Sequence, residues 1–184
     1  TSYGYGITDS NGTMELRGQS AKFAPLKSYK VELNSKLPWD NYTTVNLNKH
    51  PFDDLRIRNK LAFEIIKDIP NLVSARTQFI HLFVRDFSEG DYTKEFEDYG
   101  LFTQIENIDT DYLENHNLDK NGHLYKVENF EFRRYENKLL NSNDPDYDED
   151  AFEEILEIKG DDNHKKLLEM LDDVNINIII INII

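Results

Sequence analysis

The chain of 184 residues contains no cysteine and a single tryptophan, Trp39. Without cysteine it forms no disulfides, performs no thiol catalysis and builds no cysteine-ligated zinc site. It also lacks a long hydrophobic run: the isoleucine-rich stretch 176–184 is too short to span a bilayer. No signal peptide is visible at Thr1. We therefore expect a protein without a membrane span, long enough to bury a core.

A shortage of positive charge is equally informative, because the formal net charge is -14. Such a surface repels nucleic acid and anionic membranes, so a nucleic-acid partner is not expected. The charge is uneven. Residues 14–60 hold nine Lys or Arg against five Asp or Glu, whereas residues 144–173 hold three basic against thirteen acidic residues. A polyanionic small molecule would therefore favour the first region.

Several familiar motifs are absent or incomplete. Gly4-Tyr5-Gly6 lacks the third glycine of a phosphate-binding loop and any helix to follow it. The five histidines fall at no zinc-like spacing. The aspartates of 144–150 resemble a calcium loop but lack its sixth-position glycine and twelfth-position glutamate. No metal ligands are therefore predicted. Two sequons, at Asn11 and Asn41, favour a processed secreted protein.

Hydrophobic periodicity predicts an α+β protein. Alternation predicts two or three antiparallel strands within 1–33, the last of them over 28–33. Two strand-like runs, 77–84 and 100–106, are separated by an acidic excursion and predict a hairpin. An apolar stripe predicts a helix over 54–69, after a turn-rich passage from 34 to 54. Further expectations are a helix capped by Asp109, a strand over 123–127, helices over 151–158 and 164–171, and a lobe junction near Asn141.

Candidate site residues follow from the needs of a nucleotide site, which requires a strand cation for the phosphates and a helix carboxylate to orient it. The cations available are Arg17, Lys22, Lys27 and Lys30, and strand alternation places Lys27 and Lys30 on opposite faces. Glu64 is the helix carboxylate. Each has a plainer alternative, since strand lysines are commonly solvated and Glu64 can pair with Lys60 four residues earlier.

Four short motifs occur in a fixed order along the chain. They are Arg17-Gly18, Lys27-Ser28-Tyr29, Arg58-Asn59-Lys60-Leu61 and the run from Gly100 to Asp109, followed by Leu124-Tyr125. In order and spacing they resemble the CotH (spore coat protein H) kinase family, over about two thirds of the chain.

The resemblance implies a divergent protein-kinase-like small lobe, an antiparallel sheet plus a packed helix, with the start of a helical large lobe. Residues 1–140 would form the small lobe and hinge region, and residues 141–184 an acidic loop and helices at the start of an incomplete large lobe. Lys27 would contact the α- and β-phosphates, and Glu64 would occupy the acidic position after Arg-Asn-Lys-Leu. Glu106 would be the strand-terminal glutamate and Arg17 a second cleft cation.

The family implies ATP and Mg or Mn as cofactors, and transfer of phosphate to protein hydroxyls, classically serine in spore coat proteins. It also implies an extracellular, cell-surface or spore-coat location, and some relatives are joined to cellulosome modules. The family's Asn-x-Asp and His-Asn loop and its Pro-Trp-Asp metal motif have no counterpart after Leu171. We therefore expect the carboxylates of phosphoryl transfer to be missing here and nucleotide binding to be poor.

Two other functions stay open. One is a non-catalytic pseudokinase or a surface adhesion module, which would contact a surface partner rather than a protein substrate. The other is a carbohydrate-binding or carbohydrate-active domain, suggested by the 12% aromatic content. Most of these aromatic residues lie in apolar-periodic runs, so a core role is the better interpretation for them.

Overall fold

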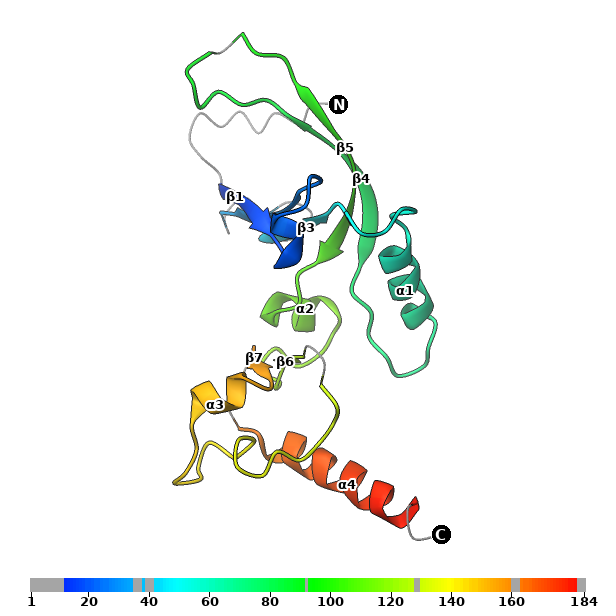
Figure 1. Ribbon diagram of the computed structural model, residues 1–184, viewed down its shortest axis with the longest axis vertical. Coiled ribbons are helices and arrows are strands. Elements are labelled where there is room, and N and C mark those ends of the chain that lie inside the picture. Colours follow the sequence, from blue (N-terminus) through cyan, green and yellow to red (C-terminus); the bar gives the residue numbers. More distant parts are fainter. Residues whose placement is uncertain are drawn as a thin grey trace. The chain divides into compact units, whose positions relative to one another are not determined.

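Alternating side chains in the first half of the chain build an antiparallel sheet of five strands, β1 to β5 (Figure 1). The computed structural model describes residues 12–34, 38, 42–91, 93–127, 130–159 and 163–181, and the side chains only as far as residue 175. The chain divides into two compact units, unit 1 (Thr1–Ile108) and unit 2 (Asp109–Ile184). The Gly4-Tyr5-Gly6 motif and the first expected strand positions lie outside the described residues. The lobe boundary at residue 140 stays a prediction.

The sheet of unit 1 has the strand order β1-β2-β3-β5-β4, and all neighbouring strands are antiparallel. The α+β class, the strand over 28–33 and the hairpin of β4 with β5 are confirmed. The strand bounds are β1 Gly12–Arg17, β2 Ser28–Leu33, β3 Thr44–Asn48, β4 Thr77–Val84 and β5 Glu97–Glu106.

Strand β3 corrects the expectation of a turn-rich passage from 34 to 54. Val45 and Leu47 are buried in the middle of the sheet, between β2 and β5. A five-residue strand with asparagine at every second position carries little local signal. Its neighbours in the sheet supply the hydrogen bonds that stabilise it.

The two faces of the sheet differ in chemistry. Val45, Leu47 and Phe102 form the buried cluster of one face, with Tyr29, Val31 and Ile80 packed against it. The opposite face carries polar residues of β1 and β3, among them Arg17, Asn46 and Asn48, whose side chains hydrogen-bond to one another. The first face supplies a buried apolar cluster, and the polar side chains of β1 and β3 lie on the other face.

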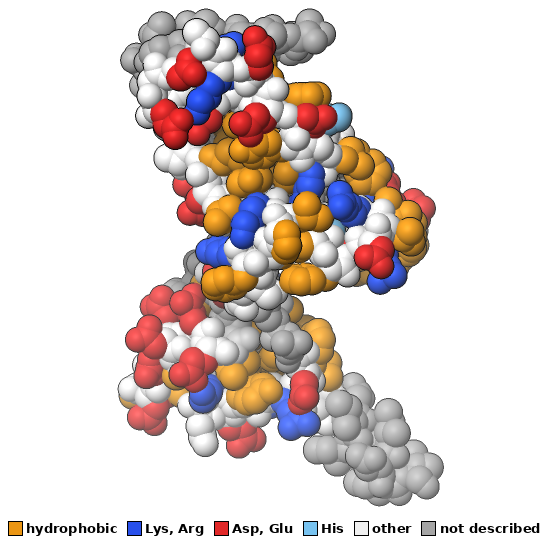
Figure 2. All heavy atoms as spheres, turned by 45° about the horizontal axis from the view of Figure 1, so that its top comes forward, with side chains coloured by type: hydrophobic (Ala, Val, Ile, Leu, Met, Phe, Trp, Pro, Cys, Tyr) orange, Lys and Arg blue, Asp and Glu red, His pale blue; other side chains and the backbone are white. Residues whose placement is uncertain are grey.

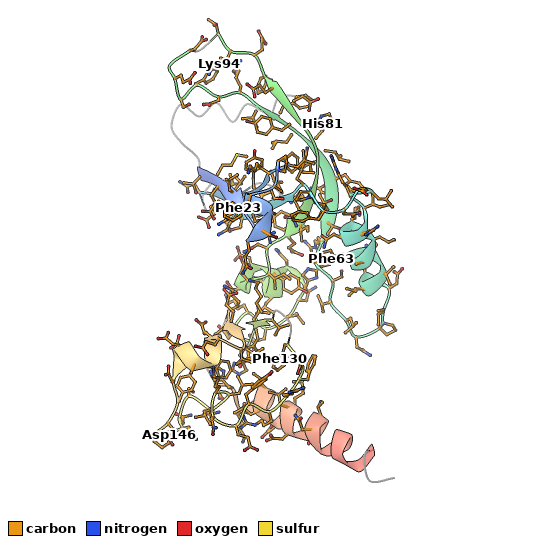
Figure 3. The ribbon with its side chains drawn as sticks, viewed as in Figure 1. Phe23, Phe63, His81, Lys94, Phe130 and Asp146 are labelled. Atoms are coloured by element: carbon orange, nitrogen blue, oxygen red, sulfur yellow. The ribbon has the colours of Figure 1, made fainter. Side chains whose placement is uncertain are left out.

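Helix α1 (Arg58–Lys67) packs against β4 and begins four residues later than expected. The Asp53 carboxylate accepts hydrogen bonds from the backbone N–H groups of Arg58, at 3.1 Å, and Leu55, at 3.2 Å. In Figure 3, Phe63 lies on the side of α1 toward β4. Only part of the expected apolar stripe packs against the rest of unit 1, because Leu61 is 54% exposed and Ile65 is 55% exposed.

Unit 2 has its own core of Leu139, Phe152, Leu156, Leu168 and Leu171. The expected strand over 123–127 is reduced to β6 (Tyr125–Lys126), which pairs with β7 (Glu157–Ile158). The expected helix over 151–158 is therefore wrong in its second half. The remaining elements are the 3-10 helix η1 (Ser20–Lys22) of unit 1 and, in unit 2, α2 (Thr110–Asn115), α3 (Glu149–Glu153) and α4 (Lys165–Ile181).

None of the helices within the described ranges is long and apolar enough to cross a membrane.

Asp109 caps α2 as expected, and its removal gives a first testable prediction. Its side chain accepts hydrogen bonds from the backbone N–H groups of Asp111, at 3.0 Å, and Tyr112, at 3.2 Å. Asp109→Ala leaves both donors without this partner, so we expect a loss of about 1 kcal/mol in unfolding free energy, measured by urea denaturation. Asp109→Asn retains a capping oxygen and should lose only a few tenths of that. Equal losses for the two variants would contradict the capping role.

Candidate functional site

Three strand ends of the sheet meet around an open pocket of about 390 Å3. Arg17 ends β1 opposite Ser28, which begins β2, and Asn48 ends β3. Because neighbouring strands are antiparallel, the end of β1, the start of β2 and the end of β3 lie at the same end of the sheet, so residues far apart in sequence line a single pocket. The lining residues are Arg17, Gly18, Gln19, Ser20, Ala21, Ser28, Asn48, His50, Pro51, Phe52 and Asp53.

Arg17 is the fixed cation of this pocket. Its Nε donates to Asn46 Oδ1 at 2.9 Å, and its Nη1 donates to Asn48 Oδ1 at 2.9 Å. Burial lowers the pKa of Arg17 from its usual value, but a guanidinium stays protonated in proteins. Both partners are neutral amides, and no carboxylate of the described residues forms an ion pair with Arg17. The pocket therefore contains an oriented positive charge that forms no ion pair within the described residues, with Asp53 as a further lining residue.

Gly18 turns the chain away from β1 and toward the 3-10 helix that follows. Its φ of +97° lies in the left-handed region that favours glycine. A side chain at Gly18 would also approach the Cβ of Ala21 to 3.1 Å. The turn thus allows the backbone to line the pocket closely.

His50 and Ser28 are two of the neutral polar residues of the pocket. Ser28 is buried, and its Oγ accepts a hydrogen bond from the backbone N–H of Lys49 at 2.9 Å. The Nε2 atom of His50 is buried and has no hydrogen-bond partner within the described residues. Burial lowers the pKa of His50, Asp53 opposes this shift and Arg17 adds to it. The imidazole is therefore neutral near pH 7.

Asp53 is the carboxylate of the pocket lining, and its oxygens are already used. They accept the backbone N–H groups at the start of α1, and Oδ1 lies 3.4 Å from Nε of Arg58. Burial alone would raise the pKa of Asp53, but the N–H groups of Arg58 and Leu55 hold it below its usual value. Asp53 therefore serves mainly to start the helix.

Lys27 lies immediately before β2, next to the pocket residue Ser28. Its ammonium donates to the carbonyl oxygen of Lys22 at 2.7 Å and does not line the pocket. The contact is exposed and lies within one loop. The phosphate-binding role of Lys27 stays a prediction.

Glu64 and Glu106 have partners other than Lys27. The Lys60 ammonium donates to Glu64 at 2.6 Å, and this hydrogen bond is the main reason that the pKa of Glu64 is lowered. Glu106 is buried at the end of β5, and its Oε2 accepts the backbone N–H of Arg76 at 2.9 Å. No described contact joins Lys27 to either carboxylate. Of the sequence-derived candidates, Arg17 is the one that lines the pocket, and the roles of the others stay predictions.

Lys49 and His50 are the polar residues of this region that sequence reasoning missed. Lys49 is buried, its ammonium lies 4.2 Å from the centroid of the Phe102 ring, and it donates to the Tyr99 carbonyl. Burial is the main cause that lowers the pKa of Lys49. Both residues directly follow β3, so a strand prediction over 44–48 would have drawn attention to them.

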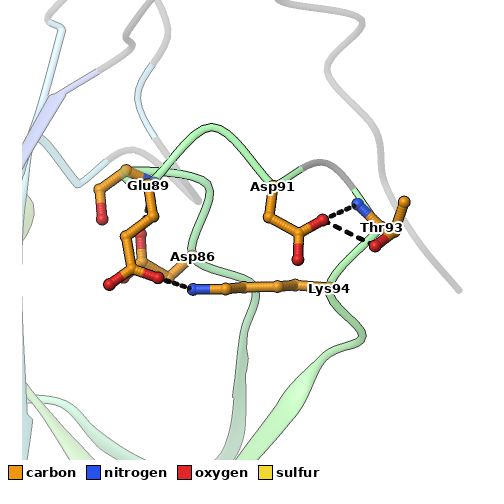
Figure 4. Close-up of polar contacts among 6 residues, drawn as sticks. Asp86, Glu89, Asp91, Thr93 and Lys94 are labelled. Carbon is orange, nitrogen blue, oxygen red and sulfur yellow. Dashed lines mark hydrogen bonds and ion pairs between the residues drawn. The ribbon is translucent and has the colours of Figure 1, made fainter.

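The acidic loop between β4 and β5 is held by its own hydrogen bonds (Figure 4). Asp91 accepts from the backbone N–H and hydroxyl of Thr93, at 2.9 and 2.6 Å, and Lys94 pairs with Glu89 at 2.8 Å. Asp86 accepts the backbone N–H of Ser88 at 2.8 Å. Figure 2 shows acidic side chains gathered at this end of unit 1, and basic ones set among hydrophobic side chains elsewhere on the same unit. Within the described ranges, no cluster of three or more His, Asp or Glu side chains is arranged to hold a metal ion.

The comparison with protein-family models matches residues 14–178 to the model described as CotH kinase protein. The matched range contains the whole lining of the pocket and every candidate residue named above. None of the curated proteins compared matches the chain.

Proposed function

Because the chain belongs to the CotH kinase family, we propose that it binds ATP with a divalent metal and takes part in phosphoryl transfer to protein hydroxyls. The observation that carries the proposal is the Arg17 guanidinium, which two asparagines hold at the wall of an open pocket and which forms no ion pair within the described residues. Phosphoryl transfer depends mainly on positioning and on fixed positive charge, and arginine is well suited to phosphate oxygens.

In this proposal the polyphosphate lies in the pocket at the ends of β1, β2 and β3. Arg17 binds a phosphate oxygen, and the Gly18 turn lets the backbone approach the phosphates. Lys27 exchanges its exposed contact with the Lys22 carbonyl for a second phosphate oxygen. The order of the main elements supports a kinase-like small lobe: three strands are followed by a helix and two further strands, and the pocket lies at one end of the sheet.

The described residues fit a polyphosphate better than they fit a metal ion. Within the described ranges no group of His, Asp and Glu is suited to hold one. In the proposal, the described residues therefore bind the nucleotide. None of them is proposed as a ligand of Mg or Mn.

A second candidate is a non-catalytic member of the family that binds nucleotide or a surface partner without transfer. It is favoured by one observation: Glu64 pairs with Lys60 on its own helix rather than with a strand lysine. In active protein kinases a strand lysine and a helix glutamate form an ion pair. The partner is a protein substrate for the first candidate and a surface partner for the second, and the proposed location is extracellular, at the cell surface or in the spore coat.

The test is calorimetric titration with ATP in the presence of Mg or Mn, on the unchanged protein and on Lys27→Ala. Loss of one charge-assisted hydrogen bond costs about 1.5–3 kcal/mol, so we expect Lys27→Ala to weaken binding at least about tenfold. Lys22→Ala is the matched control, because it removes a neighbouring charge but keeps the carbonyl that Lys27 contacts.

Absence of ATP binding by the unchanged protein would refute the proposal. Equal affinities of Lys27→Ala and the unchanged protein would remove Lys27 from the site. Transfer of labelled phosphate from ATP to protein would distinguish the kinase from the non-catalytic candidate.

A further inference from the structure

We infer that His50 is a ligand-binding residue of the Arg17 pocket, whose Nε2–H donates a hydrogen bond to an oxyanion of the ligand. The inference rests on the proposed function and deepens it, since it assigns the phosphate groups, rather than the base or sugar, to this corner of the pocket. Two observations on one residue support it: His50 lines the pocket, and its Nε2 atom is buried and has no hydrogen-bond partner within the described residues.

An unpartnered buried polar atom has a cost. Leaving such a group without a hydrogen bond typically destabilises a protein by about 1–3 kcal/mol. Surveys of protein structures therefore find most buried polar groups paired, and an exception at the wall of a pocket suggests a ligand as the missing partner.

The backbone at His50 adds a further, independent observation. Its φ of +51° lies in the left-handed region, which is uncommon for a residue with a side chain. Conformations of this kind persist where the surrounding structure enforces them, and they gather at ligand sites. His50 lines the same pocket as Arg17 and Asp53, the two charged groups that shift its pKa.

The chemistry of the wall selects an acceptor-rich anion. Ser28 Oγ already accepts from the Lys49 N–H, so its hydroxyl hydrogen remains available to a ligand. The Arg17 guanidinium has donors left after its bonds to Asn46 and Asn48. The oxygens of Asp53 accept N–H groups at the start of α1. Arg17, Ser28 and His50 thus present three donors to one space, which matches phosphate oxygens.

The experiment compares inorganic tripolyphosphate, ATP with Mg, and adenosine as ligands. His50→Ala is expected to weaken tripolyphosphate and ATP equally, by roughly tenfold, with adenosine unaffected. His50→Gln places an amide N–H near the position of Nε2 and should restore affinity to within a few fold. Leu55→Ala is the matched control, because Leu55 is 65% exposed, lies five residues from His50 and does not line the pocket.

A measurement on the unchanged protein makes the test independent of variant folding. The Nε2 nitrogen of His50, assigned by its loss in His50→Gln, should shift in long-range proton–nitrogen spectra when tripolyphosphate is added. If both anions bind but neither the shift nor the His50 variants respond, the inference is wrong and the proposed function stands. If tripolyphosphate binds through His50 and ATP does not, the anion site stands and the proposed function fails. If neither anion binds, both fail.

Discussion

Phe152→Ala is expected to lower the free energy of unfolding of unit 2 by about 3–5 kcal/mol, the usual cost of deleting a buried aromatic side chain. Phe152 is fully buried within the cluster of Leu139, Leu156, Leu168 and Leu171. Its ring stacks on His164, with the centroids 3.9 Å apart. The change therefore removes apolar contacts and also leaves a cavity beside a buried histidine.

His164 enlarges the expected effect. It is fully buried, and its two ring nitrogens lie 2.8 Å from the Tyr125 hydroxyl and 3.1 Å from the Tyr147 hydroxyl. These contacts tie β6, the loop before α3 and the start of α4 together. Without the ring of Phe152 the imidazole loses its stacking partner, so the polar contacts should loosen as well.

Urea denaturation followed by the near-ultraviolet signal of the tyrosines would measure the change. Met170→Ala is the control, because Met170 lies on α4 but is 39% exposed and should lose far less. Equal losses for the two variants would mean that the cluster is not the core of unit 2.

Sequence reasoning succeeded where local pattern and tertiary structure agree. The run Thr77–Val84 is rich in β-branched and aromatic residues, its partner strand follows within one hairpin, and Asp109 stands directly before its helix. In such cases the signal lies within a few residues of the element that it forms. The hairpin and the cap could therefore be predicted from the sequence alone.

Sequence reasoning failed where an element depends on distant partners. Strand β3 has five residues and is held between β2 and β5, the latter more than fifty positions further along the chain. Strand β7 has two residues within a segment that was expected to be helical, and it exists because it pairs with β6. No periodicity can be read from such short segments, so their structure had to come from the fold.

The candidate site shows the same division. Arg17 was predicted as a cleft cation and lines the pocket, since the Arg17-Gly18 turn is local. His50 was missed because its importance depends on β3 and on an unpartnered atom that no sequence pattern reveals. Glu64 pairs with Lys60, the plainer alternative that the sequence also offered, because residues four apart on a helix are neighbours. The family resemblance carries no information about this local pair.

Arg17→Gln should give the largest loss of nucleotide affinity among the changes proposed for the pocket. A hydrogen bond to a charged group contributes about 1.5–3 kcal/mol, and Arg17 can offer more than one donor to a phosphate. We therefore expect ATP with Mg to bind roughly 30–150-fold more weakly, a loss of about 2–3 kcal/mol. Calorimetric titration measures this directly.

Glutamine is chosen because it removes the positive charge of Arg17 while limiting the effect of the substitution on folding. Asn46 is buried and accepts a hydrogen bond from Arg17, so alanine would leave its oxygen unpaired and could destabilise the sheet. Glutamine keeps an amide donor on a shorter side chain, and thermal unfolding should confirm that the sheet is retained. Arg17→Lys keeps the charge but not the two-pronged contact with Asn46 and Asn48, so its affinity should fall between those of Arg17→Gln and the unchanged protein. If folded Arg17→Gln binds ATP as tightly as the unchanged protein, the positive charge of this pocket does not bind phosphate, and the nucleotide must be sought at another place in the chain.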